Sequence, residues 1–147
     1  MSGAASPVAW RVRPFDMGDY EAVYALWRAA GAGVSLRPSD RRDEVAKKLL
    51  RDPELFLVAE LEGRVVGVIM GAWDGRRGWL HHLAVDAACR GQGIATVLIA
   101  AVEEALRSKG CLKVNLLVGA RNERARRLYA SLGYAEMTDF VAMGKEL

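Results

Sequence analysis

The segment Arg90-Gly91-Gln92-Gly93-Ile94-Ala95 has the composition of an anion-binding loop at the start of a helix. It follows an apolar, strand-like run that ends at Val85, and it precedes a long amphipathic pattern. Backbone N–H groups in the first turn of a helix have no partner inside the helix, and the helix dipole adds partial positive charge there. Glycines let a ligand approach the backbone closely. The segment therefore predicts a phosphate site, with an ordinary glycine-containing turn as the alternative.

A second group of polar side chains, Asn122, Arg126 and Tyr129, is spaced i, i+4 and i+7 in the last helical pattern of the chain. That spacing places an amide, a cation and a phenol on one face of a helix. The alternative is that Asn122 only caps the helix and that Tyr129 packs in the core.

Two adjacent histidines, His81 and His82, lie in the strand-like run 79–85. Strand alternation predicts that successive side chains point to opposite sides of the sheet. One side would then carry Trp79, His81, Leu83 and Val85, and the other Leu80, His82 and Ala84. Because histidine titrates near neutrality, His81 is a candidate for acid–base chemistry, although a lone strand histidine more often packs and hydrogen-bonds.

The elements that must position these residues follow from hydrophobic periodicity and turn signals. A strand from Val8 to Arg13 is followed by two helices, the first capped by Asp19 and ending near Ala30, the second capped by Ser39 and ending near Leu50. The remaining predicted elements are a hairpin (55–61 and 64–70, turn Glu62-Gly63), a strand (79–85), a helix (93–109), a strand (112–118), a helix (122–132) and one or two closing strands (134–145).

Length and composition predict one domain, residues 8–147, behind a disordered tail of residues 1–7. No apolar run is long enough to span a bilayer, and the start of the chain lacks the pattern of a secretory signal, so we expect a cytoplasmic protein. Cys89 and Cys111 lack metal-ligand spacing and are expected to be reduced thiols. The net charge of +3 suits a polyanionic small molecule, and the basic segment 121–127 is interpreted as a solvated helix face rather than a nucleic-acid contact.

Three motifs occur in order: Leu83-Ala84-Val85 on a strand, Arg90-x-x-Gly93-x-Ala95 at the start of a helix, and Asn122-x-x-Ala125-x-x-Leu128-Tyr129 before Leu132-Gly133-Tyr134. In this context the chain resembles the GNAT superfamily of acyl-CoA-dependent N-acetyltransferases. The resemblance implies a single α/β domain of order β-α-α-β-β-β-α-β-α-β. Its sheet would be mixed and mostly antiparallel, with two splayed parallel strands at the centre.

The resemblance also implies acetyl-CoA as co-substrate, with no metal, and transfer of the acetyl group to a primary amine by direct attack. The pyrophosphate would bind at residues 90–95, and the pantetheine arm would pair with the backbone of Leu83, Ala84 and Val85. Asn122 and Arg126 would contact the coenzyme, and Tyr129 would donate a proton to the leaving thiolate.

Attack by an amine also needs a base, because an ammonium ion has no lone pair. Many GNAT enzymes carry a glutamate or a histidine on the strand that matches residues 79–85, and here Trp79 stands where others have glutamate. The resemblance therefore favours His81 as the base, with Glu60 as a fallback. Cys89 is interpreted as structural, since GNAT enzymes usually transfer the acyl group directly.

Other functions are less consistent with the sequence. The segment 91–96 lacks the third small residue of a dinucleotide-binding fingerprint and the Gly-Lys-Ser/Thr of a P-loop. An acyl-CoA sensor without turnover remains the alternative. The acceptor would be a small-molecule or peptide amine, in a pocket shaped by residues 19–50, with Trp27, Arg37, Arg41 and Arg42 as candidates. Neither a nucleic-acid nor a membrane partner is expected, and a second copy of the chain is a candidate partner in a homodimer.

Overall fold

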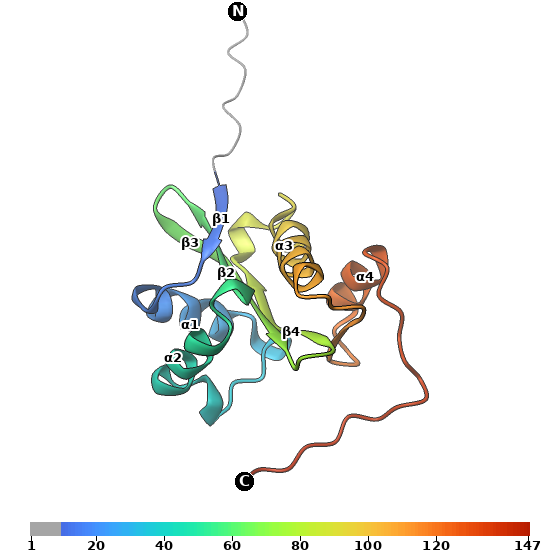
Figure 1. Ribbon diagram of the computed structural model, residues 1–147. Coiled ribbons are helices and arrows are strands. Elements are labelled where there is room, and N and C mark those ends of the chain that lie inside the picture. The colour runs from blue at the N-terminus through green and yellow to red at the C-terminus, as the bar shows by residue number, and fades with distance from the viewer. Residues whose placement is uncertain (1–9) are drawn as a thin grey trace, which may run out of the picture.

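Three consecutive strands form an antiparallel meander in the structure, a computed structural model that describes residues 10–147 (Figure 1). They are β2 (Phe56–Leu61), β3 (Arg64–Trp73) and β4 (Gly78–Val85). The turn between β2 and β3 is the predicted Glu62-Gly63 pair, whose φ angles are 51° and 79°. Two consecutive residues with positive φ make a turn whose twist matches the flanking strands. The predicted hairpin is confirmed.

The sheet is completed by β1 (Trp10–Pro14) and β5 (Val114–Leu116), in the order β1-β2-β3-β4-β5. β1 runs antiparallel to β2, and β5 runs parallel to β4. The β4–β5 pairing covers only Gly78 to Leu80 of β4, which then continues to Val85 without a strand partner on that side. The predicted mixed α/β sheet with a splayed parallel pair is confirmed, but β5 lies at an edge of the sheet rather than at its centre.

Helices cover both faces of the sheet (Figure 1). α3 (Ile94–Ser108) packs on one face, and α1 (Tyr20–Ala29) and α2 (Arg42–Arg51) contribute to the core on the other. Gly71 lets α3 approach β3 closely, because a Cβ there would lie 2.6 Å from Cγ1 of Val102. The buried side chains of α3 are Ile94, Leu98, Ile99, Val102 and Leu106. α4 (Glu123–Ser131) follows β5 and packs Leu128 and Tyr129 against the same core.

The starts of the first two helices differ in detail from the sequence prediction. Asp19 precedes α1, but its carboxylate makes no capping bond to that helix and instead accepts hydrogen bonds from Arg13. α2 begins at Arg42 rather than after Ser39, because Asp40 holds a separate turn by accepting the backbone N–H of Arg37 at 2.9 Å. The short 3₁₀ turns are η1 (Met17–Asp19), η2 (Gly31–Gly33), η3 (Pro38–Asp40), η4 (Pro53–Leu55) and η5 (Ala87–Cys89).

A bulge in β4 changes which side chains face which layer. One residue of β3, Ile69, lies opposite two residues of β4, His82 and Leu83, and His82 has a positive φ of 53°. The extra residue shifts the alternation of the strand. Leu80 therefore packs in the core under α3, whereas Ala84 packs in the core under α1. The prediction that Leu80, His82 and Ala84 share one face is wrong for this reason.

The closing strands predicted over residues 134–145 do not form. After α4 the chain continues without strand pairing through residue 147 and runs away from the sheet (Figure 1). β5 is therefore an edge strand in the described part of the chain, where no closing strand covers it. The predicted tail of residues 1–7 and the start of the first strand at Val8 lie outside the described residues.

Within residues 10–147, no helix is both long enough and apolar enough to cross a bilayer. The same part of the chain contains no group of three histidine, cysteine or acidic side chains that could hold a metal ion. Cys89 and Cys111 are buried free thiols.

Candidate active site

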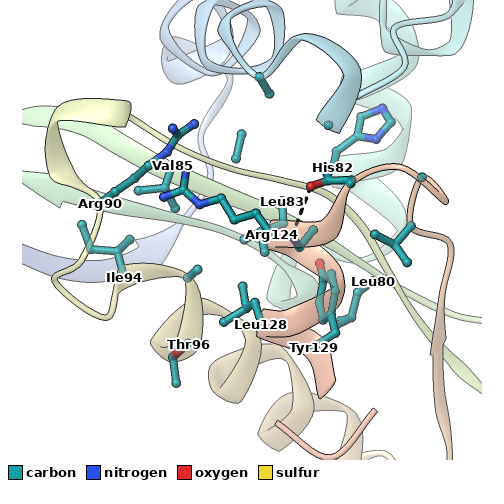
Figure 2. A pocket seen from close by; sticks show the side chains of 18 of the residues that line it. Leu80, His82, Leu83, Val85, Arg90, Ile94, Thr96, Arg124, Leu128 and Tyr129 are labelled. Carbon is teal, nitrogen blue, oxygen red and sulfur yellow. Dashed lines mark hydrogen bonds between the residues drawn. The ribbon is translucent and has the colours of Figure 1, made fainter. Parts of the chain in front are cut away.

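A cleft of about 1000 Å³ opens where β4 and β5 part, and we call it the main cleft (Figure 2). Its walls come from β4, the start of α3, the loop after β5 and α4. The predicted site residues that line it are Leu83, Ala84, Val85, Arg90, Gly91, Gly93, Ile94, Ala95, Asn122 and Tyr129. Gln92, Arg126 and His81 are not among its lining residues. The fold therefore brings most of the predicted residues, from three separate motifs, to one cleft.

The loop before α3 presents backbone donors to this cleft. Gly93 is the N-cap of α3 with φ 81°, and no side chain caps the helix. Gly91 also has a positive φ, 82°, which a residue with a side chain adopts only at a cost. The first-turn N–H groups are therefore available to an external acceptor, and Arg90 adds a cation beside them. This end of the cleft suits an anion.

The edge of β4 forms the floor of the main cleft. Beyond Leu80 this edge has no partner in β5, while the other edge of β4 stays paired with β3 through Ala84 and Val85. An unpaired strand edge can hold an extended, amide-bearing ligand by strand-like hydrogen bonds. Leu83 and Val85 also contribute partly buried apolar surface next to the α3 core.

α4 supplies the opposite wall, but with a different set of side chains from the predicted one. Asn122 caps the helix by accepting the N–H of Ala125 at 3.1 Å, which was the alternative to coenzyme binding, and it also lines the cleft. Arg126 instead pairs with Glu136, its Nε lying 2.7 Å from Oε1. Arg124, which the sequence analysis missed, lines the cleft in its place. The sequence did contain a sign of this: Arg124 lies four residues before Leu128, so the two side chains share one face of the helix.

Within residues 10–147, Tyr129 is the only phenol among the residues that line the main cleft (Figure 2). Burial raises the pKa of its hydroxyl to about 12, so the group stays protonated at neutral pH. Its neighbour Tyr134 has a different environment, because that hydroxyl donates to Glu103 at 2.8 Å. The rings of the two tyrosines pack edge to face, 5.7 Å apart. Tyr129 is thus a neutral donor at the cleft, held by its aromatic neighbour.

His82 lies at the bulge of β4 and is held from three sides. Its Nε2 lies 2.8 Å from Oδ1 of Asp40, a buried carboxylate. The indole N–H of Trp27 donates to the carbonyl of His82 at 3.1 Å, and the two rings meet edge to face at 5.1 Å. If Asp40 accepts the Nε2 proton, the neutral ring has a free lone pair on Nδ1. The geometry is that of a carboxylate orienting a histidine.

A smaller cleft of about 520 Å³ adjoins His82 on the side of α2, and we call it the small cleft. His81 and His82 both line it, so the bulge brings both rings to the same side of the sheet. His81 is exposed and stacks on Trp79 at 6.2 Å. Partial desolvation by its surroundings lowers the pKa of His81. Of the two histidines, only His82 borders both clefts.

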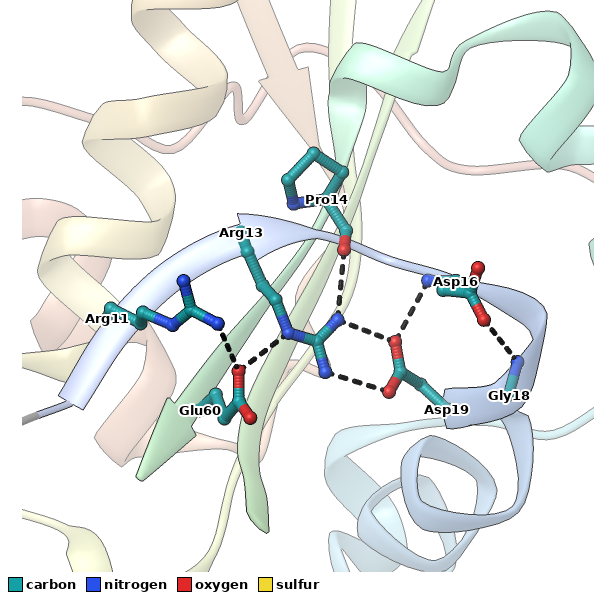
Figure 3. Close-up of polar contacts among 7 residues, drawn as sticks. All are labelled: Arg11, Arg13, Pro14, Asp16, Gly18, Asp19 and Glu60. Carbon is teal, nitrogen blue, oxygen red and sulfur yellow. Dashed lines mark hydrogen bonds and ion pairs between the residues drawn. The ribbon is translucent and has the colours of Figure 1, made fainter. Parts of the chain in front are cut away.

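Glu60, the fallback base, lies away from the main cleft in an ion-pair network at the β1 edge (Figure 3). Its Oε2 accepts from Nε of Arg13 at 2.8 Å and from Arg11 at 3.2 Å. These partners lower the pKa of Glu60, the hydrogen bond from Arg13 contributing most. Arg13 also forms a two-pronged contact with Asp19, at 2.8 and 2.9 Å. Glu60 is a structural carboxylate.

The four candidates for an acceptor pocket do not line either cleft. Trp27 is fully buried in the core, and Arg42 lies over the ring of Tyr20. Arg41 donates to the carbonyl of Pro38. The cationic residues that do border the small cleft are Lys47, Lys48 and Arg51.

Comparison with known proteins places this chain in a protein family. The model of the Acetyltransferase (GNAT) family matches residues 20–134. An acetyltransferase of Pectobacterium atrosepticum is 41% identical over 137 residues, which cover 92% of this chain and 94% of the relative. An acetyltransferase of Sodalis glossinidius matches with the same identity and coverage.

Solved structures agree with this assignment. Ard1 from Thermoplasma volcanium has a TM-score of 0.78 and 27% identity, covering 87% of this chain and 84% of that one. The PaiA N-acetyltransferase of Thermoplasma acidophilum, solved in complex with coenzyme A, has a TM-score of 0.76, and the match covers 86% of this chain and 90% of that one. At 19% identity it supports the fold alone. This chain belongs to the GNAT family and is one of its N-acetyltransferases.

Proposed function

We propose that the protein transfers an acetyl group from acetyl-CoA to a primary amine by direct attack in the main cleft. The observation that carries the proposal is the arrangement along β4. An open helix N-terminus stands at one end of an unpaired strand edge, and a protonated tyrosine stands across the cleft on α4. A thioester bound there would supply an activated acyl carbon and a thiolate leaving group.

The lining residues fit coenzyme A in chemistry and in order. The N–H groups after Gly93, together with Arg90, would bind the pyrophosphate. The β4 backbone from Leu83 to Val85 would hold the amides of the pantetheine arm. Arg124 adds a second cation from α4, whereas Arg126 is engaged by Glu136.

Tyr129 would act as the general acid. Its raised pKa, about 12, keeps the proton on the phenol at pH 7 until a thiolate forms beside it. Proton transfer to the sulfur then neutralises the leaving group.

His82 and Asp40 would accept the proton that the amine loses. The sequence favoured His81, and its lowered pKa keeps that ring neutral at pH 7. However, His81 does not line the main cleft, whereas His82 borders both clefts and has a carboxylate 2.8 Å from Nε2. An amine that enters through the small cleft would meet His82 before it reaches the thioester. We therefore assign the proton acceptor to His82, oriented by Asp40.

Coenzyme release with a panel of amines tests this function. The panel contains peptides with free N-termini, lysine side chains, polyamines and aminoglycosides, and acetylated products are identified by mass spectrometry. We expect turnover with at least one class. If the protein binds acetyl-CoA but acetylates no amine across the panel, the alternative function, an acyl-CoA sensor, replaces this proposal.

Tyr129→Phe separates chemistry from binding. We expect turnover to fall by about 100-fold, because the proton donor is lost while the ring is kept. Acetyl-CoA affinity should change by less than about twofold, since the phenol acts on the leaving group. Tyr134→Phe is the matched control, because it loses only the contact with Glu103. Unchanged turnover of Tyr129→Phe, with the chemical step limiting, would remove Tyr129 from the mechanism.

A further inference from the structure

The small cleft, which the proposed function assigns to the entering amine, is polar at both ends and apolar between them. At one end Asp40, just before the start of α2, holds His82. At the other end, the second half of α2 contributes cations. Val45 on α2 and Met70 on β3 line the cleft between the two ends. The cleft therefore suits a molecule that has a different polar group at each end.

Two of the three cations already have carboxylate partners. Nζ of Lys48 lies 2.6 Å from the buried Asp52, so its charge is matched inside the protein. Nζ of Lys47 lies 2.7 Å from Glu44, but the Lys47 side chain is 73% exposed, and exposed pairs of this kind contribute little to stability. A carboxylate that enters the cleft can therefore compete for Lys47 but not for Lys48.

Arg51 is the third cation, and it has donors left for a ligand. One of its terminal nitrogens donates to the carbonyl of Trp73 at 2.9 Å, whereas the guanidinium carries five N–H donors in all. Its contact with Asp52 is loose, because Nη1 of Arg51 lies 3.9 Å from Oδ2. Arg51 is spaced i, i+4 from Lys47, so the two side chains share one face of α2. Together they can hold a carboxylate.

The distance between the two ends follows from both walls of the cleft. Trp73, which Arg51 contacts, pairs with Gly78, and Gly78 lies four residues before His82 on β4. Four strand residues span about 13 Å. On the other wall, α2 also rises about 13 Å from its first residue to Arg51. A free amino acid, whose amine and carboxylate are a few bonds apart, is too short to reach both ends, whereas a short peptide is long enough.

We propose that the acceptor is an acidic peptide, whose amine nitrogen reaches His82 while a carboxylate about 13 Å away pairs with Arg51 and Lys47. This inference rests on the proposed function, because it names the acceptor of that reaction. The N–C bond forms and the thioester C–S bond breaks. The amine proton goes to His82, the thiolate takes a proton from Tyr129, and solvent restores both groups. Because cations line the far end, charge repulsion disfavours a polyamine or a lysine-rich peptide there.

Matched peptides test the position and the charge of the second group. One series has a free N-terminus and a single glutamate at the first, third or fourth residue. The other is blocked at the N-terminus and has one lysine followed by a glutamate at increasing spacing. All C-termini are amidated, and glutamine or arginine replaces the glutamate in the control peptides.

In whichever series is acetylated, kcat/KM should be at least ~10-fold higher with glutamate at the stated distance than with glutamine, as a charge-assisted contact predicts. Three results would overturn the inference and leave the proposed function standing: equal rates with glutamate and glutamine, a preference for arginine, or free glutamate as the best acceptor.

Variants of the chain test the residues. Arg51→Gln should lower kcat/KM for the glutamate peptide by ~10-fold, through KM, and change it by less than about twofold for the glutamine peptide. Arg51→Lys should restore part of the loss because it keeps the charge, and Lys47→Gln should give a smaller loss of the same kind. Arg107→Gln is the matched control, since Arg107 is a similarly exposed arginine on α3 and is not among the described residues that line either cleft. An equal loss for both peptides in Arg51→Gln would show that Arg51 acts through the fold alone, which contradicts the inference.

Binding separates a failure of this inference from a failure of the proposed function. Calorimetry is carried out on the full chain saturated with coenzyme A, which has no acetyl group to give. The glutamate peptide should bind at least ~10-fold more tightly than the glutamine peptide. Such binding without turnover from acetyl-CoA would remove the proposed function and keep the acidic-peptide site. Turnover with equal binding of both peptides would do the reverse, and the absence of both turnover and binding would remove both.

Discussion

At the β1 edge of the sheet charged side chains pair with one another, whereas at the β5 edge the strands part and leave a cleft. Arg13 contacts both Glu60 and Asp19, and Arg11 contacts Glu60 (Figure 3). Around the main cleft, by contrast, the helix α3 has no side-chain cap and the edge of β4 beyond Leu80 has no strand partner. One edge satisfies its polar groups internally, and the other offers them to a ligand.

The two edges also differ in protonation. Hydrogen bonds from Arg13 lower the pKa values of Asp19 and Glu60, which keeps both as carboxylates at pH 7. Burial raises the pKa of Tyr129 at the cleft to about 12, which keeps its proton available. Charge density alone therefore does not mark a functional site. Groups that lack partners in the chain mark it better, because they retain hydrogen bonds and protons to give.

The largest effect is expected for Gly93→Val, which changes the loop at the N-terminus of α3 in the main cleft. Gly93 has φ 81°, a conformation that costs a β-branched residue ~1–3 kcal/mol, so the loop should rearrange and its N–H groups should turn from the ligand. Calorimetry should show the affinity for coenzyme A falling by ~100-fold or more.

The control for that variant is Gly75→Val in the turn between β3 and β4. Gly75 has φ 95° and an equally open environment, but it does not line the main cleft. It should lose stability and keep coenzyme affinity. Equal binding by both variants would mean that the loop before α3 is not the coenzyme site.

A smaller effect is expected for His82→Gln, which separates the two histidines. We expect kcat/KM to fall by about 100-fold at pH 7, because the proton acceptor is lost. The defect should shrink as pH rises toward the pKa of the amine, about 10, since the neutral amine then needs no base.

His81→Gln is the matched variant on the adjacent residue, and pH–rate profiles of both are the measurement. It should keep near-normal activity, because His81 does not line the main cleft. A large defect in His81→Gln with a small one in His82→Gln would return the role to His81, the residue that the sequence favoured.

The smallest effect is expected at the β1 edge, where Asp19→Asn should leave turnover unchanged and lower stability. The lost charge-assisted contact with Arg13 is worth about 1–2 kcal/mol at pH 7. Because the folded pKa of Asp19 is lowered, its contribution is complete above the usual carboxyl range and disappears as pH falls through the folded pKa.

Urea unfolding at pH 7 and near pH 3 measures this change. The free energies of unfolding of variant and wild type should differ at pH 7, and the difference should narrow as pH falls below the usual carboxyl range. A constant difference across that range would show that the Arg13 contact does not act through the charge of Asp19, and a loss of turnover would connect the β1 edge to the cleft.

The local sequence pattern was sufficient to predict those parts of the structure that depend only on residues close together in the sequence. The apolar stripe of α3, the Glu62-Gly63 turn and the two glycines before α3 were all predicted, because helix period and positive φ are properties of short segments. The same reasoning explains why most residues predicted from these short motifs line the main cleft.

The surroundings of His82 depend on contacts that the sequence pattern does not contain. Asp40 lies 42 residues from His82, and the bulge that brings His82 toward it arises from the register of β4 against β3. A one-residue shift reverses the side that every later side chain faces, so alternation in the sequence could not predict it. Arg124 replaces Arg126 at the cleft because Glu136, across the end of α4, engages Arg126.

The sequence by itself determined the family, the order of elements up to α4 and the glycine loop before α3, since each depends on short motifs. Only the tertiary structure decided which histidine reaches the main cleft and that residues 135–147 find no strand partner within residues 10–147. The physical reason is common to both. Strand propensity is local, but a strand forms only where the rest of the molecule supplies an edge in register.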